Sequence, residues 1–210
     1  MKLNKIYFHI GLHKTGTSFL QRKVFPNIKE LEYYRIFNIG QPINCKTLVS
    51  YERLSGNPIS SPIDNRIEIL ESIKKNYPNA GIIVITRSID WLKSLYSTYI
   101  NGGGILLYNE WYSKIFNEEY LNQSEYIDEI KKRFDNVYSN SYENFKKDNK
   151  KIIDDICKFM DVEVPEYDND IVNKRLSDRR LIIYRALNHL PIKPKHIRFI
   201  INRIKVRINE

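Results

Sequence analysis

The chain has 210 residues, a length that suits one globular α/β domain. Of these residues 42% are hydrophobic and 28% are charged, which excludes an intrinsically disordered chain. A formal net charge of +9, from 34 Lys and Arg against 25 Asp and Glu, favours anionic partners such as a nucleotide, a sulfated or phosphorylated substrate, nucleic acid or a lipid surface. Cys45 and Cys157 have no metal-ligand spacing, and we expect both thiols to be reduced. No run reaches the roughly 20 apolar residues of a membrane span, and the first twelve residues lack a signal-peptide cleavage site. We therefore expect a cytoplasmic protein.

The N-terminal part of the chain predicts a strand, a loop and a helix in succession. Residues 5–11 are apolar and end in glycine, which is typical of a buried strand. Residues 13–18 are small and polar, and residues 19–25 predict a helix that ends near Pro26. The polar loop therefore joins the end of a strand to the start of a helix.

A second helix and a second strand follow. Ser61 and Pro62 are typical of a helix start, and apolar residues recur at helical spacing up to Ile73. Residues 81–86 are apolar throughout, as strands buried on both faces of a parallel sheet are. Arg87 stands at the end of this strand, ahead of a helix expected over residues 89–100.

The remaining elements continue the alternation. Helices are predicted near residues 108–116, 125–134, 148–160, 177–189 and 196–208, and a weaker strand at 136–140. This order predicts a single α/β domain over residues 1–210, with a central parallel sheet and helices on both faces. The basic helical segment 174–210 is expected to pack on this domain or to cap it.

The loop between the first strand and helix has the composition of an anion site. The first N–H groups of a helix lack internal partners and the helix dipole is positive there, so a phosphate binds well. Gly11 and Gly16 allow the backbone to turn and to approach the anion, and Lys14 adds a positive charge. Because this lysine precedes the second glycine, the loop differs from the common triphosphate loop G-x-x-x-x-G-K-[ST] and argues against an ordinary kinase or GTPase.

The run His9-Ile10-Gly11-Leu12-His13-Lys14-Thr15-Gly16-Thr17-Ser18 resembles the 5′-phosphosulfate-binding loop of the sulfotransferases that use 3′-phosphoadenosine-5′-phosphosulfate (PAPS). In bacterial members that act on carbohydrates, this loop often reads H-I-G-x-x-K-T-G-T-[TS]. The resemblance implies a P-loop-like domain with PAPS as co-substrate, 3′-phosphoadenosine-5′-phosphate (PAP) as product, and no metal. The residues that it assigns to the 5′-phosphosulfate are His13, Lys14, Thr15, Gly16, Thr17 and Ser18.

A second motif resembles the part of these enzymes that holds the 3′-phosphate. The family places an arginine at the end of a strand and a serine on the next helix, which implies roles for Arg87 and Ser94. The serine usually lies eight residues after the arginine, whereas Ser94 lies seven after Arg87. Residues 142–145 and 156–160 also resemble the family, and Arg175 corresponds to basic residues that close over the 3′-phosphate.

The resemblance also implies catalytic roles. Lys14 is expected to stabilise the charge on the leaving oxygen, and a general base should take the proton of the acceptor. Glu52 is our candidate for the base, since residues 50–54 resemble an S-x-E-x-L element of bacterial members. A surface ion pair between Glu52 and Arg53 is the competing interpretation, and the other candidate bases are Glu30, Glu32 and His13. His9 is expected to be a core histidine.

Residues 174–210 carry eleven Lys or Arg against two acidic residues. The simplest interpretation is a packed helix with a solvated basic face; the alternative is peripheral contact with an acidic polymer or the inner membrane face, without nucleic acid. Two other functions stay open, an ATP-dependent phosphotransferase and a non-catalytic anion-binding module. The function that we favour is sulfation of a hydroxyl or amine on a bacterial carbohydrate or glycolipid.

Overall fold

A computed structural model describes residues 5–88, 90–169 and 178–190 of the chain. Its centre is a parallel sheet of five strands in the order β2-β3-β1-β4-β5. The strands are β1 (Ile6–His9), β2 (Glu32–Tyr34), β3 (Thr47–Ser50), β4 (Gly81–Thr86) and β5 (Asn136–Ser141). This arrangement confirms the prediction of an α/β fold with a parallel sheet.

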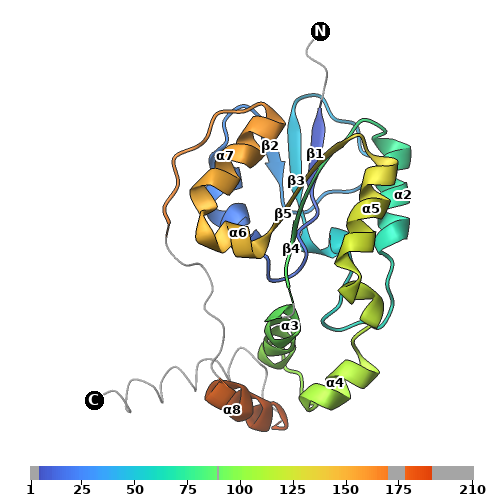
Figure 1. The fold of residues 1–210 in the computed structure, drawn as a ribbon, viewed down its shortest axis with the longest axis vertical. Helices are drawn as coiled ribbons and strands as arrows, with labels where there is room; N and C mark the ends of the chain where they lie inside the picture. Colours follow the sequence, from blue (N-terminus) through green and yellow to red (C-terminus); the bar gives the residue numbers. More distant parts are fainter. Residues whose placement is uncertain (1–4, 89, 170–177, 191–210) are drawn as a thin grey trace.

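Helices cover both faces of the sheet (Figure 1). Helices α2 (Arg66–Asn76) and α5 (Gln123–Arg133) lie on one face, and α6 (Tyr142–Lys147) and α7 (Asn149–Met160) lie on the other. The apolar run of β4 shows why, because its alternate side chains enter different cores. Ile82 and Val84 pack in the cluster on the α2 and α5 side, whereas Ile83 and Ile85 pack in the cluster on the α6 and α7 side.

Three helices extend the domain beyond the carboxyl end of β4 (Figure 1). They are α3 (Asp90–Asn101), α4 (Tyr108–Lys114) and α8 (Asp178–Asn188). Tyr184 of α8 packs against Ile100 of α3, and the Asn188 amide donates hydrogen bonds to Ile100 O and Gly104 O at 2.8 and 2.7 Å. Among the helices that the structure describes, none is both long and apolar enough to cross a bilayer.

The predicted helix start at Ser61 is wrong, because α2 begins at Arg66. Residues 57–61 form a turn instead, in which Ser61 N donates to Asn57 O at 3.2 Å. The helix begins where Asp64 Oδ1 accepts a hydrogen bond from Arg66 N at 3.0 Å, so Asp64 satisfies a donor that the helix leaves free. A long-range anchor sets this start, since the Arg66 guanidinium lies between the rings of Tyr120 and Tyr126.

The predicted helix at residues 19–25 begins earlier and changes type along its length. It consists of α1 (Thr17–Phe19), the π-helical η1 (Leu20–Val24) and the 3₁₀ helix η2 (Phe25–Asn27). The sequence prediction lacked β2, β3, α6 and the 3₁₀ helices η3 (Glu52–Ser55) and η4 (Glu118–Leu121). These elements have three to six residues, too few for periodicity to reveal. The predicted helix at residues 196–208 lies outside the described residues.

Candidate functional site

The candidate site lies at the carboxyl edge of the parallel sheet. Because all five strands run in one direction, the segments that follow β1, β3, β4 and β5 meet at this edge. These segments carry the loop of residues 11–18, Glu52, Arg87 and Tyr142. The topology therefore gathers residues that are up to 131 positions apart, the separation between Gly11 and Tyr142.

The backbone of the loop after β1 turns through two left-handed positions. Gly16 has φ of 89° and Lys14 has φ of 68°, a conformation that residues with a side chain adopt at a cost. Alternating left- and right-handed residues turn successive N–H groups toward one concave face, which favours an anion. The Thr15 hydroxyl stabilises the turn from inside, since it donates to Leu12 O at 2.6 Å.

A close contact explains the need for glycine at position 16. A Cβ atom on Gly16 would lie 2.9 Å from Cε1 of Phe145, nearer than such atoms normally approach. Phe145 is a buried residue of α6, so the loop and the helix after β5 are packed tightly together. Of the hydroxyl residues in the loop, Thr15 and Thr17 are buried and Ser18 is partly exposed.

Lys14 is the half-buried cation of this loop. Burial lowers its pKa, the Glu52 carboxylate opposes that effect, and the charge of Arg87 adds to it. The charges of Lys14, Glu52 and Arg87 therefore interact electrostatically across the site. A lysine in such a position can offer its charge to an anion at close range.

Arg87 leaves the end of β4 and turns back over the loop. Its Nη1 donates to Lys14 O at 2.5 Å and lies 3.4 Å from Ser94 Oγ, and its guanidinium carbon is 4.5 Å from the centre of the Tyr142 ring. Ser94 is buried on α3, with 2% of its surface exposed. The structure thus brings Arg87 and Ser94 together despite the seven-residue spacing.

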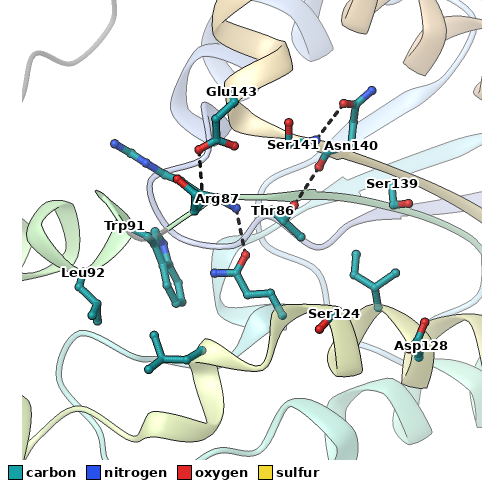
Figure 2. A pocket seen from close by; sticks show the side chains of 14 residues that line it. Thr86, Arg87, Trp91, Leu92, Ser124, Asp128, Ser139, Asn140, Ser141 and Glu143 are labelled. Carbon is teal, nitrogen blue, oxygen red and sulfur yellow. Dashed lines mark hydrogen bonds between the residues drawn. The ribbon is translucent and has the colours of Figure 1, made fainter.

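The main chain around Arg87 is also held. Arg87 N donates to Gln123 Oε1 at 2.9 Å, and Ser88 N donates to Glu143 Oε1 at 3.2 Å (Figure 2). Trp91 Nε1 donates to His13 O at 2.5 Å, so the first turn of α3 is attached to the phosphate loop. These contacts orient the Arg87 side chain from both ends of its segment.

Glu52 opens η3 directly after β3, next to the loop. Its Oε2 atom lies 3.3 Å from His13 Nδ1, so the contact that the structure gives Glu52 is with His13 rather than Arg53, and it is an ion pair when His13 is protonated. Burial raises the pKa of Glu52, but the hydrogen bond and charge of His13, with His9 and Lys14, outweigh it and leave this pKa lowered. The carboxylate is therefore stabilised beside Lys14.

The other candidate bases stand elsewhere. Glu32 is the first residue of β2 and pairs in register with Thr47 at the start of β3. It therefore lies at the amino ends of the strands, away from the carboxyl edge that carries the candidate site. Glu30 precedes it and accepts a hydrogen bond from Glu163 N at 2.6 Å. His9 is a buried core residue, as expected, and its Nδ1 lies 2.7 Å from Ser50 Oγ.

A cavity of about 660 Å³ opens beside Arg87, between the ends of β4 and β5 and helix α5 (Figure 2). Ser124, Ser139 and Asn140 contribute polar groups to its lining, and Trp91 and Leu92 contribute apolar ones. Two carboxylates, those of Asp128 and Glu143, also line it. Since these carboxylates repel a phosphate, the loop and the Arg87 guanidinium suit an anion better than this cavity does.

Sequence reasoning missed several residues that shape the site. Tyr142, Gln123 and Trp91 contact Arg87 or the loop from three different elements. The tyrosine-glutamate pair at the start of α6 was visible as a motif, whereas nothing local marked Gln123. Arg175 lies outside the described residues. Within the described ranges, no group of three or more His, Cys, Asp or Glu residues is placed to hold a metal ion.

Comparison with known proteins supports the fold. No family model and no curated protein sequence matches the chain. Among solved structures, a sulfotransferase from Alicyclobacillus acidocaldarius is similar with a TM-score of 0.58 and 16% identity, over 87% of this chain and 91% of the other. Mouse sulfotransferase SULT7A1 in complex with PAP is similar with a TM-score of 0.53 and 15% identity, over 88% of this chain and 65% of the other. The chain therefore has the sulfotransferase fold.

Proposed function

We propose that this chain is a sulfotransferase that moves the sulfuryl group of PAPS to a hydroxyl or amine of an acceptor. The observation that carries this proposal is the meeting of Lys14, Glu52 and Arg87 at one edge of a sheet with the sulfotransferase fold. The likeness to SULT7A1, solved with PAP, supports the choice of nucleotide. The sequence motif around Lys14 supports it independently of the fold.

The two ends of the nucleotide have separate partners in this proposal. The 5′-phosphosulfate binds to the N–H groups of residues 13–18 and to Lys14. The 3′-phosphate binds to Arg87, whose planar guanidinium donates two hydrogen bonds at once, and to Ser94. The 3.4 Å contact between Arg87 and Ser94 supports a shared ligand. Arg175 is a further proposed contact.

The chemistry follows from the charges at the site. The acceptor oxygen or nitrogen attacks sulfur in line, a new bond to sulfur forms, and the bond from sulfur to the bridging oxygen of PAP breaks. Lys14 stabilises the negative charge that develops on this bridging oxygen. Glu52 takes the proton that the acceptor loses.

The acceptor that we propose is a bacterial carbohydrate or glycolipid, and the resemblance of the loop to carbohydrate-type members is its support. The net charge of +9 favours an anionic acceptor or surface. The basic segment 174–210 would supply that contact, either with an acidic polymer or with the inner face of a membrane, in an otherwise cytoplasmic protein.

Calorimetric titration with PAP tests the nucleotide half of the proposal. Wild type should bind PAP more tightly than ATP with Mg²⁺, and Lys14→Ala and Arg87→Ala should each weaken PAP binding about tenfold to hundredfold, the loss expected for a charge-assisted contact. Lys93→Ala, which removes an exposed charge from α3, is the matched control and should bind like wild type.

Other results would redirect the assignment. A preference for ATP with Mg²⁺ that ignores Arg87 would indicate a phosphotransferase. Binding of anionic polymer that survives Lys14→Ala but is lost when residues after 190 are removed would indicate a binding module. With PAP binding established, screening labelled PAPS against saccharide and lipid acceptors would identify the substrate.

A further inference from the structure

His13 contacts an acceptor with each of its two ring nitrogens. Its Nε2 lies 3.2 Å from the carbonyl oxygen of Gly56, and its Nδ1 lies 3.3 Å from Oε2 of Glu52. The His13 side chain is 10% exposed, so water competes little for either contact. A carbonyl oxygen can only accept, so the contact with Gly56 requires the hydrogen to be on Nε2.

This requirement determines what Nδ1 can do. In the neutral ring with hydrogen on Nε2, Nδ1 carries a lone pair that faces the Glu52 carboxylate. In this neutral form two acceptors lie opposite each other, and the hydrogen bond from His13 that lowers the pKa of Glu52 forms only when Nδ1 is protonated. A proton added to either group forms a hydrogen bond between Nδ1 and Oε2. This hydrogen bond stabilises the protonated pair.

The surroundings hold this geometry in place. Gly56 has φ of 80°, and the ring of Tyr120 leaves no room there for a side chain. The N–H of Asn57, which shares a peptide unit with the Gly56 carbonyl, donates to Tyr120 Oη at 3.0 Å and so helps to orient that carbonyl. Ser55 Oγ donates to Gly11 O at 3.0 Å and ties the turn after β3 to the phosphate loop. Besides the contact of Glu52 with His13, two hydrogen bonds therefore join this turn to the loop, one from Ser55 to Gly11 and one from His13 to Gly56.

The other charges near Glu52 come from β1 and its loop. His9 and Lys14 face the carboxylate together with His13, and the fully buried His9 has a pKa lowered to about 4 by burial, against the effect of Glu52. His9 is therefore uncharged near neutral pH, and it does not exchange protons with Glu52 in that range. His13 is the titratable partner that contacts Glu52 directly.

We propose that His13 is the second member of a two-residue base with Glu52, in which the proton taken from the acceptor comes to lie between Glu52 and His13. This inference rests on the proposed function. The acceptor bonds to sulfur as the bond from sulfur to the bridging oxygen of PAP breaks, the acceptor O–H or N–H bond breaks, and its proton moves to the Glu52 carboxylate. It then passes to His13 Nδ1, which leaves an ion pair, and is later released to water. No other co-reactant is needed.

Hydrolysis of PAPS, in which water replaces the unidentified acceptor, tests this on the full chain across a range of pH. Glu52→Gln should slow hydrolysis roughly 100-fold or more, the contribution of a general base. His13→Asn keeps a donor near the place of Nδ1 but cannot take a proton. In this variant the rise of the rate with pH should move toward acid and reach a lower plateau, because only a carboxyl group, which is more acidic than an imidazole, is left to take the proton. His189→Asn, at an exposed histidine, should behave like wild type.

A pH profile that is the same in His13→Asn as in wild type would overturn the proposal. Binding of PAP is measured in parallel, since failure of wild type to bind PAP would reject the proposed function instead. A purely structural role of His13 would lower the rate at all pH values without moving the profile.

Nuclear magnetic resonance of ¹⁵N-labelled histidine gives a second test that needs neither PAPS nor an acceptor. At high pH the His13 ring should carry its hydrogen on Nε2, as the Gly56 contact requires. Hydrogen on Nδ1 in the neutral ring would reject the paired base.

Discussion

The Arg87 guanidinium lies over the face of the Tyr142 ring, with 4.5 Å between its carbon and the ring centre. Arg87 follows β4 and Tyr142 opens α6 directly after β5, so neighbouring strands place a cation on an aromatic face. The same guanidinium donates to Lys14 O at 2.5 Å. Its position is therefore set by the phosphate loop on one side and by α6 on the other.

Replacing Tyr142 with leucine should weaken PAP binding about twofold to fivefold, because Arg87 loses a cation–π contact worth about 0.5–1 kcal/mol at a partly exposed position. Tyr142→Phe keeps the ring and should bind PAP as wild type does. Isothermal titration calorimetry of the two variants measures the difference. Equal affinity in the leucine variant would show that the ring does not orient Arg87.

Gly16→Ala should weaken PAP binding at least tenfold and lower the free energy of unfolding by about 1–2 kcal/mol, the cost of a left-handed residue with a side chain. The added Cβ would also press on Phe145. Gly102→Ala is the matched control, since its Cβ would meet only ordinary contacts at 3.4 Å. Calorimetry and urea unfolding give the two quantities, and normal binding by Gly16→Ala would contradict the loop geometry described above.

Arg66→Met should lower the free energy of unfolding by about 3–5 kcal/mol, because it leaves the Asp64 carboxylate buried without its partner. The two side chains are 6% and 17% exposed and lie 2.6 Å apart. The double variant Asp64→Leu with Arg66→Met should recover part of this loss, since no unpaired charge remains. Lys132→Ala, which breaks an exposed pair, should cost no more than about 0.5 kcal/mol in urea unfolding. A similarly small effect of Arg66→Met would contradict its role as the anchor of α2.

The free energy of unfolding should decrease as the pH is lowered, because His9 is buried in its neutral form. Burial lowers the pKa of His9 from 6.5 to about 4, so its contribution is complete above pH 6.5 and is lost as the pH falls through 4. We expect about 2 kcal/mol less free energy of unfolding at pH 5 than at pH 7 from this group, since the unfolded state takes up the proton first.

His9→Asn isolates this effect from those of other groups. The asparagine side chain can keep a hydrogen bond to Ser50 where His9 Nδ1 now lies 2.7 Å from Ser50 Oγ, yet it does not titrate. The difference between urea unfolding at pH 7 and at pH 5 should shrink by the stated amount. If the variant retains the full wild-type pH dependence, another group is responsible for it.

Long elements with clear periodicity were predictable from the sequence. The strand β4 was expected at the residues where it is found, and α7 within one residue, because each has a continuous pattern of apolar side chains. The position of the loop between β1 and α1 was also predictable, since its glycine, lysine and hydroxyl residues follow an apolar strand and precede a helix. Short elements such as β2 and β3 were not, because a sheet neighbour stabilises them rather than their own sequence.

By itself, the sequence determined the fold class, the glycine-rich loop between β1 and α1, and the cation at the end of β4. Each of these depends on neighbouring residues, whose side chains and backbone preferences act within a few positions. Only the tertiary structure decided that Glu52 meets His13, that Arg87 lies on Tyr142, and that Glu32 stands at the far edge. These relationships depend on the order and direction of the strands, because parallel pairing brings the ends of distant segments together while local patterns carry no record of which strands become neighbours.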